Sequence, residues 1–293
     1  MKRFGIDVSK WQGNFDFDRA KEEGVEFVIL RGAYSTGKDV KFEKYYSDCK
    51  LYDIPVGVYQ YSMAQTVEQA KKEAEFLYNN VLRGKKFEYP IYIDIEDRTQ
   101  LALSRNLLTE IAETWCAYLE AKKYYVGIYA GKYTLLHNMD DTRLKRYTHW
   151  IPMWAEECTY EDKSVLGMWQ FGGEKNVLRK NTVAGVVCDQ NYAYVDFPAV
   201  IKAKRLNGYT NTPVTQKPVT KPVNASQTAL KIGDKVKLKA GAKYSNGQKI
   251  PVWVFEKTLY IRSKELSGGV YNVSTLKTGA ITGRVNKIYI SKA

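Results

Sequence analysis

The feature that most constrains the fold of this chain is a series of short apolar segments over residues 1 to about 200. We predict eight strands there: Phe4–Val8, Phe27–Ala33, Pro55–Tyr61, Pro90–Ile95, Tyr125–Tyr129, His149–Trp154, Val165–Phe171 and Val186–Tyr192. Helical patterns separate several of them, including one capped by Thr66 and one over 107–123. Mostly apolar strands separated by helices are typical of a parallel sheet. The sequence therefore predicts an irregular, TIM-like β/α barrel with fewer helices than strands.

The pattern changes twice after this region. Residues 211–229 hold three prolines, many threonines and no large apolar side chain beyond valine, which is typical of a semi-extended linker. Residues 230–293 alternate again, and Asn246-Gly247 and Gly268-Gly269 are turn signals. We therefore predict a large β/α domain over 1–205, a Pro/Thr-rich linker over 206–229, and a small all-β antiparallel barrel of about five strands over 230–293.

The positive charge of the chain is concentrated at its C-terminal end. Residues 1–201 carry 27 Lys and Arg against 29 Asp and Glu, whereas residues 230–293 carry 13 against 3. A basic domain of this size calls for a polyanionic partner. Nucleic acid is one candidate, but no motif for nucleic-acid binding is present, so we do not expect it.

Other classes of protein are disfavoured by composition. No export signal is recognisable near the N-terminus and no stretch approaches the ~20 apolar residues of a membrane span. The four cysteines lack metal-type spacing, and His137 and His149 are the only histidines. We therefore expect reduced, buried thiols, no metal and no cofactor.

Polar and aromatic side chains gather where the predicted strands end. In a β/α barrel the working residues lie at the C-terminal ends of the strands. The candidates are Asp7, Tyr34, Tyr59, Tyr61, Asp94, Glu96, Tyr129, Trp154, Gln170 and Asp189. Carboxylates with Tyr and Trp rings suit the binding and cleavage of a sugar chain.

The segment "PIYIDIED" (90–97) carries the clearest chemical signal. Asp94 and Glu96 are two residues apart on a strand, so their side chains point to the same face, which we expect to be the barrel mouth. Two crowded carboxyl groups suit acid–base chemistry on a glycosidic bond, because crowding raises the pKa of one of them. Alternatively they are solvated strand-end acids or ligands of a divalent cation. We expect Asp97 to be a strand-end or loop residue.

Seven segments together resemble glycoside hydrolase family 25, the lysozyme-type muramidases. They are "GIDVSKWQG" (5–13), "FVILRGAYSTG" (27–37), "PVGVYQYS" (55–62), "YPIYIDIE" (89–96), "YVGIYAG" (125–131), "MWQF" (168–171) and "CDQNYAY" (188–194). The resemblance covers residues 3–197 in the family's order. It implies cleavage of the β-1,4 bond between N-acetylmuramic acid and N-acetylglucosamine in peptidoglycan.

The same resemblance implies roles for individual residues. Glu96 matches the proton donor, and Asp94 matches the carboxylate that orients the substrate's 2-acetamido group for attack on the anomeric carbon. Asp7 and Asp189 match the remaining acids. Tyr61 and Trp154 are similar to the aromatic wall of the site. Trp11 and Gln12 belong to the opening motif, where a structural role in holding the first loop is at least as plausible as a role in binding.

The C-terminal domain resembles bacterial SH3-like wall-binding modules. With the charge of this domain, Trp253, Tyr260 and Tyr271 suit an anionic, sugar-containing wall polymer, although these rings could equally be core. The whole arrangement is similar to that of phage endolysins of Gram-positive hosts, which stay in the host cytoplasm until a holin pore releases them to the wall. A bacterial autolysin, or a non-catalytic glycan-binding protein on a degenerate barrel, are the alternatives.

Overall fold

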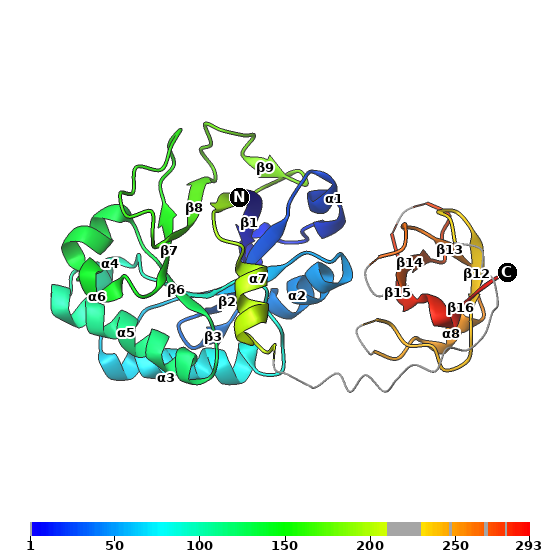
Figure 1. The fold of residues 1–293 in the computed structure, drawn as a ribbon, viewed down its shortest axis with the longest axis horizontal. Coiled ribbons are helices and arrows are strands. Elements are labelled where there is room, and N and C mark those ends of the chain that lie inside the picture. Colours follow the sequence, from blue (N-terminus) through cyan, green and yellow to red (C-terminus); the bar gives the residue numbers. More distant parts are fainter. Residues whose placement is uncertain (1, 210–229, 246–247, 267–268, 279) are drawn as a thin grey trace. The chain divides into compact units, whose positions relative to one another are not determined.

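The computed structural model describes residues 2–209, 230–245, 248–266, 269–278 and 280–293. The chain divides into two compact units, Met1–Val214 and Thr215–Ala293, and Figure 1 labels their elements. Within the described ranges, no helix has both the length and the apolar composition needed to cross a membrane.

The first unit is built on a closed eight-stranded barrel. Its strands are β1 (Arg3–Val8), β2 (Phe27–Tyr34), β4 (Val56–Tyr61), β5 (Ile91–Asp94), β6 (Val126–Tyr129), β7 (Thr148–Pro152), β8 (Leu166–Gly172) and β11 (Asp189–Ala193). The sheet runs β1-β11-β8-β7-β6-β5-β4-β2, and a parallel pairing of β1 with β2 closes it. Three short strands lie outside this ring: β3 (Gly37–Lys38), β9 (Thr182–Val183) and β10 (Val186–Val187).

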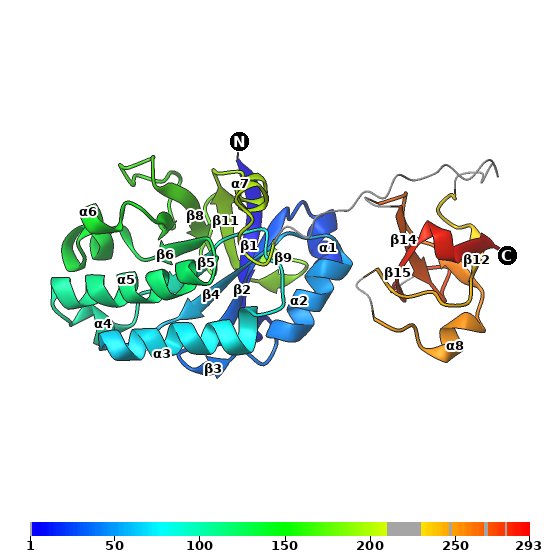
Figure 2. The same ribbon diagram turned by 60° about the horizontal axis from the view of Figure 1, so that its bottom comes forward.

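The helices are unevenly distributed around this barrel, as Figure 2 also shows. They are η1 (Lys10–Gln12), α1 (Phe17–Glu22), α2 (Phe42–Leu51), α3 (Val67–Leu77), η2 (Tyr78–Leu82), α4 (Arg98–Leu101), α5 (Arg105–Ala121), η3 (Thr134–Asn138), α6 (Asp141–Leu144) and α7 (Phe197–Lys204). No helix lies between β7 and β8, where every residue is described. Between residues 2 and 209, seven α-helices (α1–α7) accompany the eight barrel strands, so the predicted barrel with fewer helices than strands is confirmed when α-helices alone are counted.

Side-chain N-caps mark where helices α3 and α5 begin. The Thr66 side chain accepts a hydrogen bond from the backbone N–H of Gln69 and caps α3, as predicted. Ser104 caps α5 in the same way, through the backbone N–H of Leu107.

Two apolar layers hold the barrel together. Ile91, Ile93 and Ile95 are fully buried in the outer layer, which also contains the buried faces of α3 and α5. This outward direction of the isoleucines confirms the predicted orientation of the β5 strand. The interior holds a separate cluster that includes Phe27, Tyr92 and Trp150, together with Phe197 and Ile201 of α7.

The last barrel strand differs from the prediction. We expected one strand over Val186–Tyr192 in a parallel sheet, but β10 ends at Val187 and β11 begins at Asp189, antiparallel to both β8 and β1. The connection from β8 to β11 contains only the β9–β10 hairpin. A parallel return requires a crossover, usually a helix, so this connection brings the chain back antiparallel.

The barrel unit also extends past the predicted boundary at residue 205. Asn207 is fully buried: its side-chain amide donates to the carbonyl of Tyr89 at 2.8 Å and its side-chain carbonyl accepts from the backbone N–H of Tyr125 at 2.6 Å. Residues 206–209 therefore pack with the barrel. The rest of the predicted linker, residues 210–229, lies outside the described residues.

The second unit contains a five-stranded antiparallel sheet in the order β15-β14-β13-β12-β16. Its elements are β12 (Lys235–Leu238), α8 (Val252–Phe255), β13 (Leu259–Ile261), β14 (Val270–Ser274), β15 (Gly283–Asn286), η4 (Lys287–Tyr289) and β16 (Ile290–Lys292). Val236, Leu259, Ile261, Val273 and Val285 form its fully buried core. The predicted turn at Asn246-Gly247, and Gly268 of the other turn, lie outside the described residues.

Candidate active site

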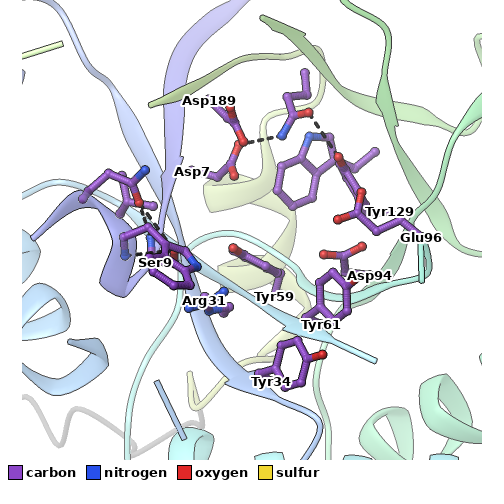
Figure 3. Close-up of a pocket in the computed structure, with 15 residues that line it drawn as sticks. Asp7, Ser9, Arg31, Tyr34, Tyr59, Tyr61, Asp94, Glu96, Tyr129 and Asp189 are labelled. Carbon is purple, nitrogen blue, oxygen red and sulfur yellow. Dashed lines mark hydrogen bonds between the residues drawn. The ribbon is translucent and has the colours of Figure 1, made fainter. Parts of the chain in front are cut away.

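A pocket of about 370 Å³ opens at the C-terminal ends of the parallel barrel strands (Figure 3). Most of the side chains predicted from the strand ends line it: Asp7, Tyr34, Tyr59, Tyr61, Asp94, Glu96, Tyr129, Gln170 and Asp189. Trp154 is not among the lining residues, and its ring lies beside the Asp189 carboxyl group, against Gly173. The closed barrel therefore brings side chains from distant parts of the sequence to one cavity.

Asp94 and Glu96 have different environments within this pocket. Asp94 is the last residue of β5 and is 4% exposed, and its Oδ1 is buried without a hydrogen-bond partner among the described residues. Glu96 follows the strand and is accessible to solvent. Asp97 turns away to cap α4, since its Oδ1 accepts from the backbone N–H of Thr99 at 2.9 Å. Asp97 thus lies between β5 and α4 as the N-cap of that helix, in line with the expected strand-end or loop position.

Asp7 and Asp189 are brought together by the antiparallel strand. They are direct partners in the register of β1 with β11. Asp189 thus opens its strand, contrary to the predicted strand end, yet it reaches the same edge because β11 runs in the opposite direction. Asp7 Oδ2 accepts hydrogen bonds from Asn191 Nδ2 at 2.8 Å and from Gln170 Nε2 at 3.0 Å.

The four carboxyl groups form one electrostatic cluster. Burial raises the pKa of Asp7 to about 6, although the amides of Asn191 and Gln170 act in the opposite direction. Burial and the charges of Asp7 and Glu96 raise the pKa of Asp189 to about 8. Burial, then Glu96 and Asp7, raise the pKa of Asp94 well above its usual range.

The pKa of Glu96 is raised as well, first by desolvation in the pocket and then by the charges of Asp7 and Asp97. A solvent-accessible carboxyl group with a raised pKa can carry a proton to a bound substrate near neutral pH. The cluster therefore holds fewer charges than carboxyl groups near neutral pH, and some of its acids are protonated.

Aromatic rings form part of the pocket wall. The rings of Tyr34 and Tyr61 stack with centroids 4.9 Å apart and planes 10° apart. Gln170 connects other members of the site: its Oε1 accepts from the Tyr129 hydroxyl at 3.1 Å and from the indole N–H of Trp154 at 3.2 Å. The half-exposed Trp154 ring is thus held in place by the same amide that contacts Asp7.

Trp11 and Gln12, in the segment 5–13, have different surroundings. Gln12 Oε1 accepts from the backbone N–H of Ser9 at 2.8 Å, and Gln12 Nε2 donates to the carbonyl of Val187 at 3.4 Å. Trp11 lines the pocket with 75% of its side chain exposed. Gln12 therefore holds the first loop, while the Trp11 ring is available to a ligand.

The sequence did not predict several contributors to the site. Val8, Ser9, Arg31 and Trp150 also line the pocket, and Asn191 donates a hydrogen bond to Asp7. Arg31 could have been noticed as a charge within the apolar run "FVILRGAY". Asn191 and Trp150 carry no comparable local signal, because what they contact depends on the closure of the barrel.

The histidines and cysteines lie apart from this chemistry. His149 is fully buried and contacts the Tyr160 hydroxyl at 2.9 Å, and it does not line the pocket. Cys49, Cys116 and Cys188 are buried free thiols whose pKa burial raises. Among the described residues, no group of three or more His, Cys, Asp and Glu side chains is arranged to hold a metal ion.

In the second unit, the three aromatic candidates have different surroundings. Trp253 lies on α8 with 52% of its side chain exposed. Tyr260 on β13 is partly exposed and pairs in register with Lys235 of β12. Tyr271 is only 2% exposed and belongs to the core, and its hydroxyl donates to Glu265 at 2.9 Å. The prediction that Tyr271 binds the wall is therefore wrong for this structure, since strand alternation directs its ring inward.

Comparison with known proteins identifies the family. The family model described as "Glycosyl hydrolases family 25" matches residues 6–179. The chain belongs to this family. The autolytic lysozyme of Clostridium acetobutylicum is 28% identical over 164 residues, which are 56% of this chain and 48% of that protein. The chain thus spans about half the length of this curated relative.

Solved structures agree on the fold of the barrel. The modular autolysin LytC from Streptococcus pneumoniae, solved with a synthetic peptidoglycan ligand, gives a TM-score of 0.57 at 20% identity over 66% of this chain and 47% of LytC. The catalytic domain of endolysin ply40, from bacteriophage P40 of Listeria monocytogenes, gives 0.55 at 18% identity over 69% and 97% of the two chains.

The crowded acids predict a pH-dependent gain in stability from Asp189→Asn. The folded-state pKa of Asp189, about 8, lies above its ordinary value of 3.8, so ionisation destabilises the folded state increasingly between about pH 4 and pH 8. We expect a higher Tm for the variant at pH 8, by roughly 2–4 °C for each kcal/mol regained, and little difference at pH 4. Thermal melts followed by circular dichroism measure this.

The matched control is Glu75→Gln, which changes an exposed acid on α3 and should leave the difference between the two pH values unchanged. An Asp189→Asn variant that melts no higher than wild type at pH 8 would contradict the electrostatic account.

Proposed function

We propose that this protein is an N-acetylmuramidase that cleaves the β-1,4 bond between N-acetylmuramic acid and N-acetylglucosamine in peptidoglycan. The observation that carries the proposal is the pairing of Asp94 and Glu96 at one strand end. Asp94 is buried and its Oδ1 has no hydrogen-bond partner among the described residues, whereas Glu96 is accessible to solvent and its pKa is raised. Family membership supports the reaction class.

The two environments suit two roles in a substrate-assisted reaction. Glu96 donates its proton to the glycosidic oxygen as the bond to the leaving sugar breaks. Asp94 Oδ1 accepts a hydrogen bond from the N–H of the substrate's 2-acetamido group, whose carbonyl oxygen then attacks the anomeric carbon. Water opens the resulting cyclic intermediate, and the Glu96 carboxylate accepts the proton of that water.

Asp7 and Asp189 contribute to the same reaction as part of the cluster. The ionised Asp7 carboxylate stabilises positive charge that develops at the anomeric carbon, and the amides of Asn191 and Gln170 fix the position of Asp7. Tyr34, Tyr61 and Trp154 present rings on which sugars stack. A non-catalytic glycan-binding protein would need the rings but not four acids in one pocket.

For the second unit, over residues 230–293, we propose an SH3-like wall-binding module. The support is its excess of basic residues, the exposed Trp253 ring and the antiparallel sheet. Its partner is an anionic wall polymer rather than nucleic acid. Residues 206–229 would then act as linker beyond the four residues that pack on the barrel.

For the biological role we propose a phage endolysin that is released through a holin pore and lyses the host from within. A catalytic unit joined to a separate basic unit supports this role. The same architecture is compatible with a bacterial autolysin, and proteins of both kinds share the barrel fold. Finding the gene beside phage structural and holin genes would favour the first role over the second.

The first prediction for this function concerns the proton donor. Glu96→Gln should fold like wild type and lose ~10² to 10⁴ in turnover, the usual contribution of general acid catalysis. Mass spectrometry of digested peptidoglycan, which detects new reducing muramic acid ends, measures the rate. Glu75→Gln on the outside of α3 serves as control, and near wild-type cleavage by Glu96→Gln would rule out this assignment.

The second prediction concerns substrate assistance. Asp94→Asn should be severely impaired, because an amide does not polarise the acetamido group as a carboxylate does. The first product of the wild-type enzyme should retain its anomeric configuration, which proton NMR can observe before mutarotation. Inversion would show instead that a carboxylate activates water directly.

The third prediction concerns division of labour between the units. Residues 1–209 should cleave isolated peptidoglycan alone, whereas residues 230–293 should carry most of the affinity for intact walls. The electrostatic part must weaken with salt, since the Debye length falls from ~10 Å at 0.1 M to ~3 Å at 1 M. Sedimentation of each fragment with purified walls across a salt series measures both parts.

A salt-resistant remainder should depend on Trp253 and not on its exposed neighbour. Trp253→Ala should reduce the remainder, and Val252→Ala, a matched change on the same helix with 76% exposure, should leave it intact. If the fragment 1–209 binds walls as tightly as the whole chain while the fragment 230–293 stays in solution, the proposed wall-binding role of residues 230–293 is wrong.

A further inference from the structure

A carboxyl group is buried on helix α3, outside the pocket. Glu73 is 3% exposed and shares the buried face of the helix with Ala70, Ala74 and Leu77. Its Oε2 accepts a hydrogen bond from Ser62 Oγ at 2.7 Å, and its Oε1 accepts from the backbone N–H of residue 63 at 2.9 Å. Neither partner is a cation. Burying a carboxyl group without one is costly, so this position requires an explanation.

Gln100 of α4 joins the same network and is fully buried. Its Nε2 donates to Ser62 Oγ at 3.0 Å and to the carbonyl of Ala64 at 2.9 Å. Its Oε1, however, is buried without a hydrogen-bond partner among the described residues. A buried polar network with an unpaired acceptor contributes less to stability than a fully paired one. Stability alone is therefore a poor reason to keep these groups buried.

The main chain of α3 is fixed independently at this residue. Gln60 of β4 donates from Nε2 to the carbonyl of Glu73 at 3.0 Å and to the carbonyl of Ser35 at 2.7 Å. Its Oε1 accepts from the indole N–H of Trp115 of α5 at 2.7 Å. Substitution of the Glu73 side chain should therefore leave the helix in place and affect the segment that this side chain holds.

The segment 62–64, which Glu73 holds, continues β4 beyond Tyr61 and contacts the aromatic wall of the pocket. Met63 Sδ accepts a hydrogen bond from the Tyr34 hydroxyl at 3.3 Å. The rings of Tyr34 and Tyr61 stack on one another, and both line the cavity. Figure 3 shows these two rings next to one another. A continuous chain of contacts therefore runs from Glu73 through Met63 to the ring pair.

The ring pair is also tied to α4. The Tyr61 hydroxyl donates to Oδ2 of Asp97, the N-cap of this helix, at 3.3 Å. Asp94, by contrast, meets the segment only along the main chain: the backbone N–H of Ser62 donates to the Asp94 carbonyl at 3.0 Å. This bond continues the β4–β5 ladder and needs no side chain. The side-chain network thus acts on the rings rather than on the acids.

We propose that Glu73 is a positioning residue that fixes the Tyr34–Tyr61 ring pair as a stacking surface for one sugar of the bound glycan. This inference rests on the proposed function. A sugar that packs on an aromatic face does so before and during bond cleavage alike, so the ring pair contributes equally to ground-state and transition-state binding. Loss of the Glu73 contacts should therefore raise KM and leave kcat almost unchanged.

The test compares Glu73→Gln with Glu75→Gln in the full chain, on soluble oligosaccharides of alternating N-acetylglucosamine and N-acetylmuramic acid. Glutamine keeps the size of the side chain but replaces one of the two acceptor oxygens by a donor. We expect KM to rise about tenfold, the equivalent of about 1.4 kcal/mol of lost binding. Glu75→Gln changes an exposed acid on the same helix and should alter neither constant.

Tyr61→Leu, alone and combined with Glu73→Gln, separates positioning of the rings from a general loss of structure. If Glu73 acts through the ring pair, the double variant should have the KM of Tyr61→Leu, because no pair is left to position. Independent effects would multiply instead, and that result would overturn the proposal. A fall in kcat with unchanged KM would overturn it as well, since the network would then act on the reaction itself.

Should Glu73→Gln not fold, Ser62→Ala tests the same network. It removes the hydroxyl that Glu73 Oε2 and Gln100 Nε2 share. KM should rise here too, again without a further rise when Tyr61→Leu is added. An unchanged KM in Ser62→Ala would contradict the proposal.

A binding measurement does not depend on cleavage. In the Glu96→Gln background, calorimetric titration with the same oligosaccharides should give a Kd about tenfold higher when Glu73→Gln is added, equivalent to about 1.4 kcal/mol. An equal Kd for the two proteins would refute the positioning role. Binding that depends on Glu73, without any cleavage by the wild type, would refute the proposed function and leave this role intact.

Discussion

The antiparallel closure of the barrel is the constraint on which the site depends. Because β11 runs against β1 and β8, the first residue of β11 lies at the edge where the other strands end. This places Asp189 opposite Asp7 and brings Asn191 within hydrogen-bond distance of the same aspartate. A parallel eighth strand would direct its first residue to the opposite end of the barrel, and the cluster would lack one acid and one amide.

Gathering these acids in one desolvated cavity lowers the free energy of unfolding. The surrounding side chains reduce this cost without removing it. The amides of Asn191 and Gln170 stabilise charge on Asp7, and Arg31 does so for Asp94. The pKa of Asp189 nevertheless stays near 8. Buried groups whose ionisation opposes folding are expected where chemistry requires them, and this supports the proposal that the cluster is catalytic.

The sequence predicted those features that follow from local pattern. The period-two alternation of Ile91, Ile93 and Ile95 placed β5 and its outward face, and the ends of parallel strands had to meet at one edge. It did not predict the direction of the last strand, which depends on what connects β8 to β11. Alternation also says which residues share a face but not which face is covered, so Tyr271 in the core and the partly exposed Tyr260 on the same sheet could not be distinguished.

The two units carry different charges because the pocket and the proposed wall-binding surface place different requirements on electrostatics. The pocket needs a fixed, partly dehydrated arrangement of opposite charges, where Arg31 and Asp39 interact at short range and salt screens little. The recognition of a wall polymer that we propose for the second unit would need instead an exposed excess of positive charge, which acts at long range and is screened. If the basic residues of 230–293 were spread over the barrel, they would add cations around an acidic pocket in whose described lining Arg31 is now the single cation. Keeping the two kinds of electrostatics on separate units therefore lets each be strong without disturbing the other.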